Sequence, residues 1–188
     1  ISFDIARHDP YNRVMTDVMI AIEGLATSPD TTILTIAAVE FDPLVRDKLG
    51  RQYYVRVDME SQEGRKIEQG TLDWWATQPA AIRDDAFCEQ GRVSLRDSLE
   101  GLTRMVWHSR RIWAQGPCYD MTILEHAYKS LNMALPWKYY AVRDSRTLFS
   151  LAPQLERYPA SHNALEDCCC QIALLWDIME YLKIKELR

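Results

Sequence analysis

Three short segments, far apart along the chain, carry side chains suited to acid–base or metal chemistry. Glu23 ends the apolar run IAIE, Asp120 stands in CYDM, and His162 and Asp167 frame the segment HNALED. Carboxylates are the hard oxygen ligands that Mg²⁺ and Mn²⁺ prefer. A histidine, with an ordinary pKa of about 6.5, can exchange a proton at neutral pH. If the fold brought these side chains together, they would suit a metal site with an acid–base group beside it.

Taken singly, each of these residues has an ordinary structural interpretation. A glutamate at the end of a strand usually faces solvent, and an aspartate before a helix is often its N-cap. His162 would be a loop residue and Asp167 a solvated helix residue. Because five residues turn a helix by about 140°, the two converge only if His162 lies in the loop before the helix. An N-cap at Asn163 would place it there.

The pattern of apolar residues predicts the scaffold that must position these side chains. Apolar alternation, turn residues and helical spacing indicate the following elements: strands at 17–23, 32–41, 52–57, 111–115 and 140–144; a short helix from 71 to about 78 and a second one after it; and helices at 94–107, 121–131 and 163–182. Three hairpin-linked strands followed by alternating helices and strands predict an α/β fold. Its mixed five-stranded sheet would have three antiparallel and then parallel strands, flanked by helices.

Composition limits the classes of function. The 188 residues suit one domain, and a net charge of −5 argues against coating long nucleic acid, although not against gripping one strand end. No apolar run is long enough to span a membrane. The five cysteines show no zinc spacing, so we expect them to be reduced thiols. We therefore expect the protein in the cytoplasm of a bacterium or a phage-infected cell. Residues 1–14 read as a tag or upstream remnant before Met15, leaving 15–188 as the domain.

The order, spacing and context of the three segments resemble the exonuclease motifs of the DEDDh, or DnaQ-like, 3′-to-5′ exonuclease family. The resemblance covers nearly all of 15–182, and its most specific part is the His-x4-Asp motif that opens the last helix. The adjacent Trp74 and Trp75, and the segment DSRT at 144–147, are similar to the small phage and bacterial branch of the family. The resemblance implies a ribonuclease H-like fold and an enzyme that removes nucleotides from a 3′ end.

The resemblance also implies roles for individual residues. Two Mg²⁺ or Mn²⁺ ions would be held by Glu23, Asp120 and Asp167, and His162 would take a proton from the attacking water. The implied substrate contacts are Leu25, Trp75, Tyr119 and Arg146. The purely structural alternatives are that Trp75 belongs to the hydrophobic core and that Arg146 forms an ion pair with a nearby acidic residue.

Ala21 is the departure from the family pattern. Residues 21 and 23 project from the same face of a strand, and the family has a metal-bridging aspartate where this chain has Ala21. Since a methyl group cannot bind a metal, we expect this chain to be nearly inactive. The alanine is either an engineered substitution or the mark of a natural pseudoenzyme, and retention of the other motif residues favours engineering.

Two rival functions stand beside the enzyme. One is a non-catalytic nucleic-acid-binding module on the same fold, and the other is a protein-interaction domain without a nucleic-acid partner. The intact second and third motifs favour the enzyme, acting on single-stranded or 3′-overhanging nucleic acid. RNA and DNA both stay open as substrates, as does a homodimer.

Overall fold

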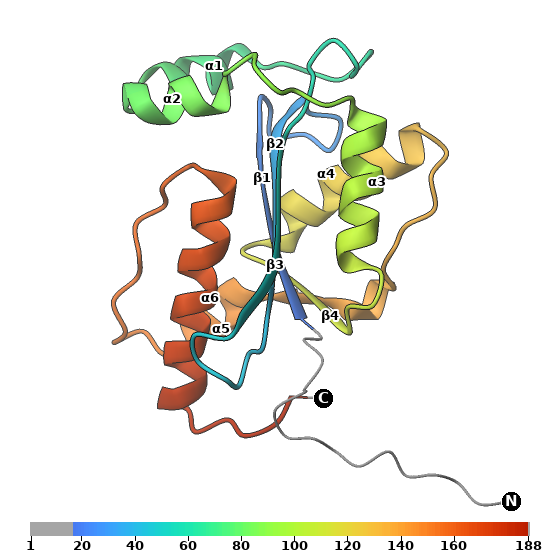
Figure 1. Cartoon of the computed structure of the whole chain (residues 1–188). Coiled ribbons are helices and arrows are strands. Elements are labelled where there is room, and N and C mark those ends of the chain that lie inside the picture. The colour runs from blue at the N-terminus through green and yellow to red at the C-terminus, as the bar shows by residue number, and fades with distance from the viewer. Residues whose placement is uncertain (1–16, 188) are drawn as a thin grey trace, which may run out of the picture.

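A mixed five-stranded sheet forms the centre of the computed structural model, which describes residues 17–187 (Figure 1). Its strand order is β3-β2-β1-β4-β5. The strands are β1 (Asp17–Gly24), β2 (Ile33–Phe41), β3 (Leu49–Arg56), β4 (Arg111–Ala114) and β5 (Val142–Asp144). β1, β2 and β3 pair antiparallel, whereas β4 pairs parallel with both β1 and β5. The predicted division into three antiparallel and then parallel strands is confirmed.

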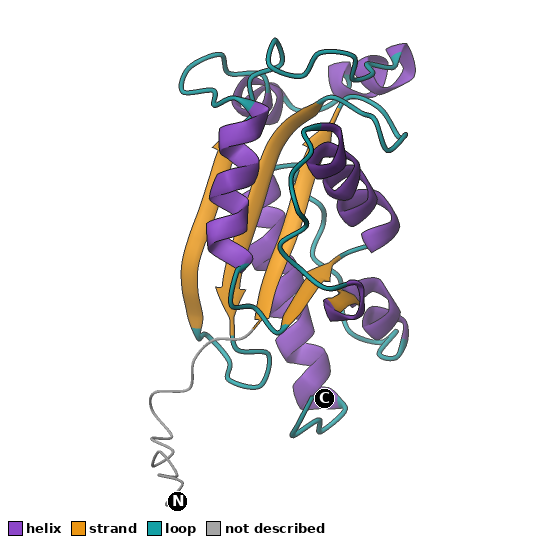
Figure 2. Cartoon of the chain, turned by 90° about the vertical axis from the view of Figure 1, so that its right-hand side faces the viewer, coloured by secondary structure: helices purple, strands orange, loops and turns teal. Residues whose placement is uncertain are grey.

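Helices cover both faces of this sheet, as the view in Figure 2 shows. They are α1 (Gln69–Ala76), α2 (Ala80–Ala86), α3 (Leu95–Val106), α4 (Pro117–Ser130), α5 (Ser145–Ser150) and α6 (Ala164–Tyr181), with a 3-10 turn η1 (Tyr139–Ala141). None of the helices described within residues 17–187 combines the length and the apolar character that crossing a bilayer requires.

β1 lies in the middle of the sheet and divides its side chains between two cores. Val18, Ile20 and Ile22 pack with residues of α3 and α4 on one face. Met19 and Ala21 pack with residues of α6 on the other face. Because side chains alternate along a strand, Glu23 continues the row of Met19 and Ala21 and points toward the start of α6.

α1 and α2 lie across the end of the sheet at which β1 finishes, close to the start of α6 (Figure 1). Trp75 of α1 and Ala86 of α2 form a small buried core with Leu25 and Leu34. This helical pair, 69–86, is the part of the scaffold that borders the carboxylates described below.

α4 begins four residues before the position that the apolar spacing predicts. Gly116 precedes the helix with φ of 98°, a left-handed conformation that glycine adopts without strain, and Pro117 occupies the first turn. The predicted start at Met121 is therefore wrong. Asp120 lies in the first turn of the helix and is not its N-cap.

Candidate active site

Glu23, His162 and Asp167 come together where β1 ends. One ligand atom from each of these three side chains lies within 4.8 Å of the others, although residues 23 and 167 are far apart in the sequence. The ladder between β1 and β2 shifts register between Glu23 and Gly24. Such irregularities are common beside active sites, where they redirect a side chain.

The start of α6 explains how His162 and Asp167 reach the same place. Asn163 is the N-cap, and its side-chain oxygen accepts hydrogen bonds from the backbone N–H groups of Leu165 at 3.0 Å and Glu166 at 3.2 Å. His162 thus precedes the helix, as the sequence predicts, and its φ of 56° lies in the left-handed region. Non-glycine residues adopt that region rarely, and strained residues of this kind cluster at functional sites.

Ser161 holds the carboxylate of Asp167. The Oδ1 atom of Asp167 accepts hydrogen bonds from the backbone N–H of Ser161 at 2.7 Å and from its hydroxyl at 3.0 Å. Ser161 is a site residue that the sequence motifs do not reveal, because this contact depends on how the loop turns back over the helix. The only available signal was a small hydroxyl residue next to His162.

Asp120 lies beside this group of three, buried in the first turn of α4. Its Oδ1 accepts a hydrogen bond from the backbone N–H of Ile22 at 3.2 Å, which ties α4 to β1 next to Glu23. Burial raises the pKa of Asp120 to about 7, against the lowering effects of hydrogen bonds from backbone N–H groups and of the charge of Arg146. The negative charge of Asp167 contributes to the rise.

Glu23 has the most perturbed carboxyl group of the site. Burial raises its pKa to about 9, and the charges of Asp167 and Asp120 raise it further in the same direction. Carboxylates held this close repel one another unless a cation or protons lie among them. The oxygen-rich donor set and this mutual repulsion therefore fit a site for a hard divalent cation.

Ala21 leaves the position next to Glu23 apolar. Its side chain is 6% exposed and packs in the core on the α6 face of the sheet. It projects from the same face of β1 as Glu23, toward the helix that carries Asp167. A carboxylate at position 21 would therefore point into the acidic cluster.

A pocket of about 530 Å³ opens beside Glu23. Its walls come from the end of β1 with the residues that follow, from the start of α1, and from α4: Glu23, Gly24, Ala26, Thr27, Glu68, Gly70, Thr71, Trp74 and Tyr119. Tyr119 was predicted as a substrate contact, and its hydroxyl donates to the Ala26 carbonyl at 3.4 Å. At Gly24, a Cβ atom would lie 3.1 Å from the Tyr119 hydroxyl oxygen, so a larger residue would crowd the pocket wall.

Leu25 and Trp75, two of the predicted substrate contacts, are buried. Each side chain is 1% exposed, and the indole N–H of Trp75 donates to the Gly24 carbonyl at 3.1 Å. Neither offers a surface on which a base could stack, so the expectation for both is corrected. The neighbouring Trp74 is 39% exposed, and its ring meets the His162 ring edge to face with 4.8 Å between centroids.

Arg146, the last predicted contact, is exposed beside the site. Its Nη2 atom donates to the Gln115 carbonyl at 3.1 Å, and its charge lowers the pKa of Asp120. The structure thus brings Glu23, Asp120, His162, Asp167, Tyr119 and Arg146 to one region, and it places Leu25 and Trp75 in the core beneath it.

The two adjacent tryptophans give a matched test of this assignment. We expect Trp75→Ala to lower the free energy of unfolding by about 3–5 kcal/mol, because it empties a fully buried site. Trp74→Ala should cost only about 1 kcal/mol, since its side chain is partly exposed. Denaturant unfolding of both variants measures the difference, and equal losses would contradict the placement.

Comparison with known proteins identifies the family of the chain. The family model of the 3′-5′ exoribonuclease Rv2179c-like domain matches residues 16–179, and the chain belongs to that family. The predicted membership of a 3′-to-5′ exonuclease family is therefore confirmed. No curated protein matches the sequence.

Solved structures share the fold at low sequence identity. Pop2p of S. pombe, in a form with Mg²⁺ and Mn²⁺ bound, has a TM-score of 0.61 at 12% identity, over 93% of this chain and 86% of its own. The nuclease domain of 3′hExo, a DEDDh family member bound to rAMP, has a TM-score of 0.57 at 12% identity, over 92% of this chain and 94% of its own. Exonuclease X, in complex with 5′ overhanging duplex DNA, has a TM-score of 0.50 at 16% identity, over 90% of this chain and 94% of its own. The fold is thus the ribonuclease H-like fold of these nucleases.

Proposed function

We propose that this chain is the scaffold of a metal-dependent 3′-to-5′ exonuclease that acts at a single-stranded or overhanging 3′ end, and that Ala21 leaves it nearly inactive. The observation that carries the proposal is the convergence of Glu23, His162 and Asp167 within 4.8 Å. Asp120, hydrogen-bonded to the β1 backbone, completes the set. Membership of a family described as a 3′-5′ exoribonuclease domain supports the same reaction.

Each polar side chain of the site has a distinct part in the proposal. Glu23, Asp120 and Asp167 would hold two Mg²⁺ or Mn²⁺ ions, the ions bound to the similar Pop2p. When bound, such ions stabilise charge on the scissile phosphate and favour deprotonation of water. His162, at the rim of the acidic cluster and outside the helix, would accept the proton from the water that attacks phosphorus.

The pocket beside Glu23 would receive the terminal nucleotide. The exposed part of Trp74 offers a ring for stacking, and Tyr119 forms another part of the pocket wall. Arg146, whose charge lowers the pKa of Asp120, would pair with a backbone phosphate. The bound rAMP of 3′hExo and the DNA of Exonuclease X support a nucleic-acid substrate, and the family description favours RNA.

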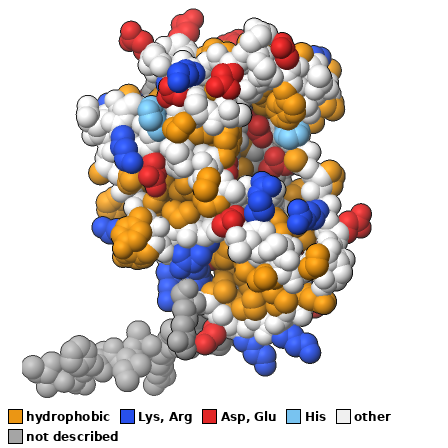
Figure 3. Space-filling view, turned by 180° about the vertical axis from the view of Figure 1, so that it is seen from behind, with side chains coloured by type: hydrophobic (Ala, Val, Ile, Leu, Met, Phe, Trp, Pro, Cys, Tyr) orange, Lys and Arg blue, Asp and Glu red, His pale blue; other side chains and the backbone are white. Residues whose placement is uncertain are grey.

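The surface suits contact with a strand end more than with a long duplex. Basic and acidic side chains are interspersed on the face in Figure 3, which also carries several separate hydrophobic patches. The net charge of −5 agrees with a short footprint. We place the protein in the small phage and bacterial branch because Trp74, Trp75 and the segment at 144–147 resemble that branch. Its five free cysteines support a reducing cytoplasm. A homodimer belongs to the same proposal, by analogy with the family.

A second candidate is a nucleic-acid-binding pseudoenzyme, and the observation in its favour is Ala21. The two candidates differ in how binding depends on metal. The acidic cluster should repel a phosphate unless divalent ions are present, whereas a binding module has no such requirement.

Binding by the chain as it stands distinguishes these two candidates. We expect 5′-labelled single-stranded RNA or DNA with a free 3′ hydroxyl to bind at least about tenfold more tightly in Mg²⁺ or Mn²⁺ than in EDTA. Fluorescence anisotropy measures this at constant ionic strength, and a 3′-phosphorylated strand serves as the control for end recognition. Equal binding with and without metal would favour the pseudoenzyme.

A further inference from the structure

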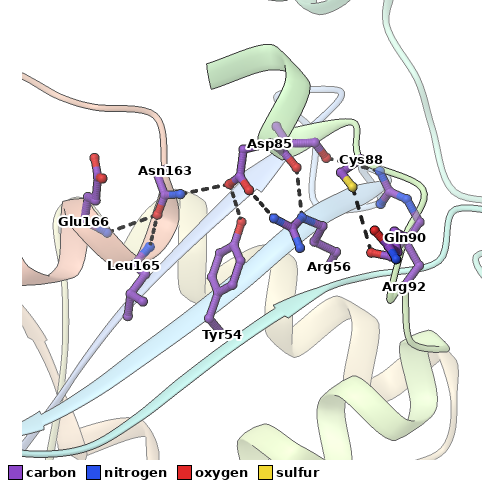
Figure 4. A network of polar contacts seen from close by, with 10 residues as sticks. Tyr54, Arg56, Asp85, Cys88, Gln90, Arg92, Asn163, Leu165 and Glu166 are labelled. Atoms are coloured by element: carbon purple, nitrogen blue, oxygen red, sulfur yellow. Dashed lines mark hydrogen bonds and ion pairs between the residues drawn. The ribbon is translucent and has the colours of Figure 1, made fainter. Parts of the chain in front are cut away.

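Asp85, at the end of α2, joins three elements that are distant in the sequence (Figure 4). Its Oδ2 atom accepts hydrogen bonds from the Tyr54 hydroxyl at 2.8 Å and from the side-chain amide of Asn163 at 2.9 Å. Its Oδ1 atom pairs with the guanidinium of Arg56, whose Nε also donates to the Asp85 carbonyl at 2.9 Å. The Asp85 carboxylate thus links α2 to β3 and to Asn163, the N-cap of α6.

Asn163 uses both ends of its amide. The oxygen caps α6, and the nitrogen donates to Asp85. His162 is the next residue toward the N-terminus and has a left-handed backbone. Because the position of Asn163 determines where the chain enters α6, the hydrogen bond to Asp85 restrains the backbone that carries the imidazole.

The same helical pair touches His162 from a second side. Trp74 on α1 meets the imidazole at 88°, with 4.8 Å between ring centroids. Asp85 lies on α2, directly after α1 in the chain. The pair 69–86 therefore contacts the His162 loop at two points, through a ring on α1 and a carboxylate on α2.

The partners of Asp85 favour its charged form. Burial tends to raise its pKa, but hydrogen bonds from Tyr54, Arg56 and Asn163, together with the charge of Arg56, lower the pKa overall. The side chain is 31% exposed, so the ion pair with Arg56 alone would add little to stability. Its geometry fits a restraint better than a source of folding energy.

We propose that Asp85 is a positioning residue for His162: through Asn163 it holds the His162 loop so that the imidazole stands against Trp74 and above Glu23 and Asp167. The catalytic consequence rests on the proposed exonuclease function. The geometric part does not, and it is tested in the chain as it is.

The competing explanation is that Asn163 acts only as a helix cap, and Asn163→Ser separates the two roles. Serine is an N-cap about as good as asparagine, but it has no amide with which to reach Asp85. Asn163→Asp also keeps the cap and places a second carboxylate opposite Asp85. In the double variant D85N/N163D, the amide lies at position 85 and the carboxylate at position 163. Donor and acceptor are exchanged, so the hydrogen bond between the two positions can form again.

The first measurement is the NMR signal of the His162 ring in the present chain, assigned with H162Q. The Trp74 ring should impose a ring-current shift on the imidazole protons, and Trp74→Phe should alter it. We expect N163S, N163D and D85A to lose most of this shift, with helix content retained, and D85N/N163D to recover it. D177A is the matched control, since it removes an aspartate paired with Arg46 from the far end of α6.

The second measurement is kinetic, in the A21D background. Displacing a catalytic base by about 1 Å can cost about 100-fold in rate, so we expect N163S and D85A to lower kcat about 10–100-fold. KM and the metal concentration for half-maximal rate should change by less than about threefold, because the metal ligands are untouched. D177A should leave kcat unchanged, and D85N/N163D should recover part of the loss.

These measurements separate the two levels of the proposal. An unchanged ring-current shift in N163S and D85A would overturn the positioning role whatever the enzyme does. A lost shift with an unchanged kcat would overturn its catalytic consequence. If A21D is inactive with an intact Asp85–Asn163 pair, the exonuclease proposal fails and the NMR result alone decides the position of His162.

Discussion

Ala21→Asp is expected to turn this chain into a nuclease that shortens a 5′-labelled strand one nucleotide at a time in Mg²⁺ or Mn²⁺. The rate should rise at least about 1,000-fold over the present chain, equivalent to about 4 kcal/mol of transition-state stabilisation. The reason is geometric. Position 21 faces α6 two residues before Glu23, so the new carboxylate would join Glu23 and Asp167 as a ligand.

End-labelled RNA and DNA oligonucleotides, incubated with Mg²⁺, Mn²⁺ or EDTA, measure this effect. A 5′ label should give a descending ladder, and a 3′ label should be released at once as a mononucleotide. Ala21→Asn is the matched control, because it has the shape of aspartate without its charge and should recover far less activity. A folded A21D protein that cuts neither RNA nor DNA would show that Ala21 belongs to a natural pseudoenzyme.

The metal-free chain should lose stability as the pH rises from about 6 to about 8. Unfolded Glu23 releases its proton near its ordinary pKa of 4.5, whereas the folded site raises that pKa to about 9. Asp120, with its pKa raised to about 7, behaves in the same way over a narrower window. The folded state therefore binds more protons than the unfolded state, and the free energy of unfolding falls by up to about 1.4 kcal/mol per pH unit for each group.

Glu23→Gln should remove much of this dependence. The glutamine side chain stays neutral, so the metal-free variant should be more stable than its parent above about pH 6 and should respond less to pH. Mg²⁺ should stabilise the parent at pH 8 and have little effect on the variant. Denaturant unfolding at several pH values measures both effects, with the exposed Glu60→Gln as a control. Parallel pH profiles for parent and Glu23→Gln would contradict the assignment.

The sheet could be predicted because its signals are local. Alternation along β1 and β2, the turn between them and the helical period of α6 each lie within a short window of sequence. The convergence of His162 and Asp167 was also predictable, since it requires only that Asn163 cap the helix. The start of α4 was not, because the apolar period begins later than the helix that Gly116 and Pro117 permit.

The details of the site depend on packing that no local pattern encodes. Trp74 and Trp75 are chemically identical neighbours about 100° apart on a helix, and the fit of α1 against Leu25 decides which of them is buried. The roles of Ser161 and Asp85 likewise cannot be predicted from a local pattern. Their partners lie across loops or on other elements, so their roles follow from the folded backbone.

The distribution of the site over the chain has a consequence for its biosynthesis. β1, which carries Glu23, leaves the ribosome before α6, which carries Asp167 and follows His162. A nascent chain can therefore form the antiparallel hairpin without assembling the acidic cluster. The carboxylates can therefore meet only after α6 has been made.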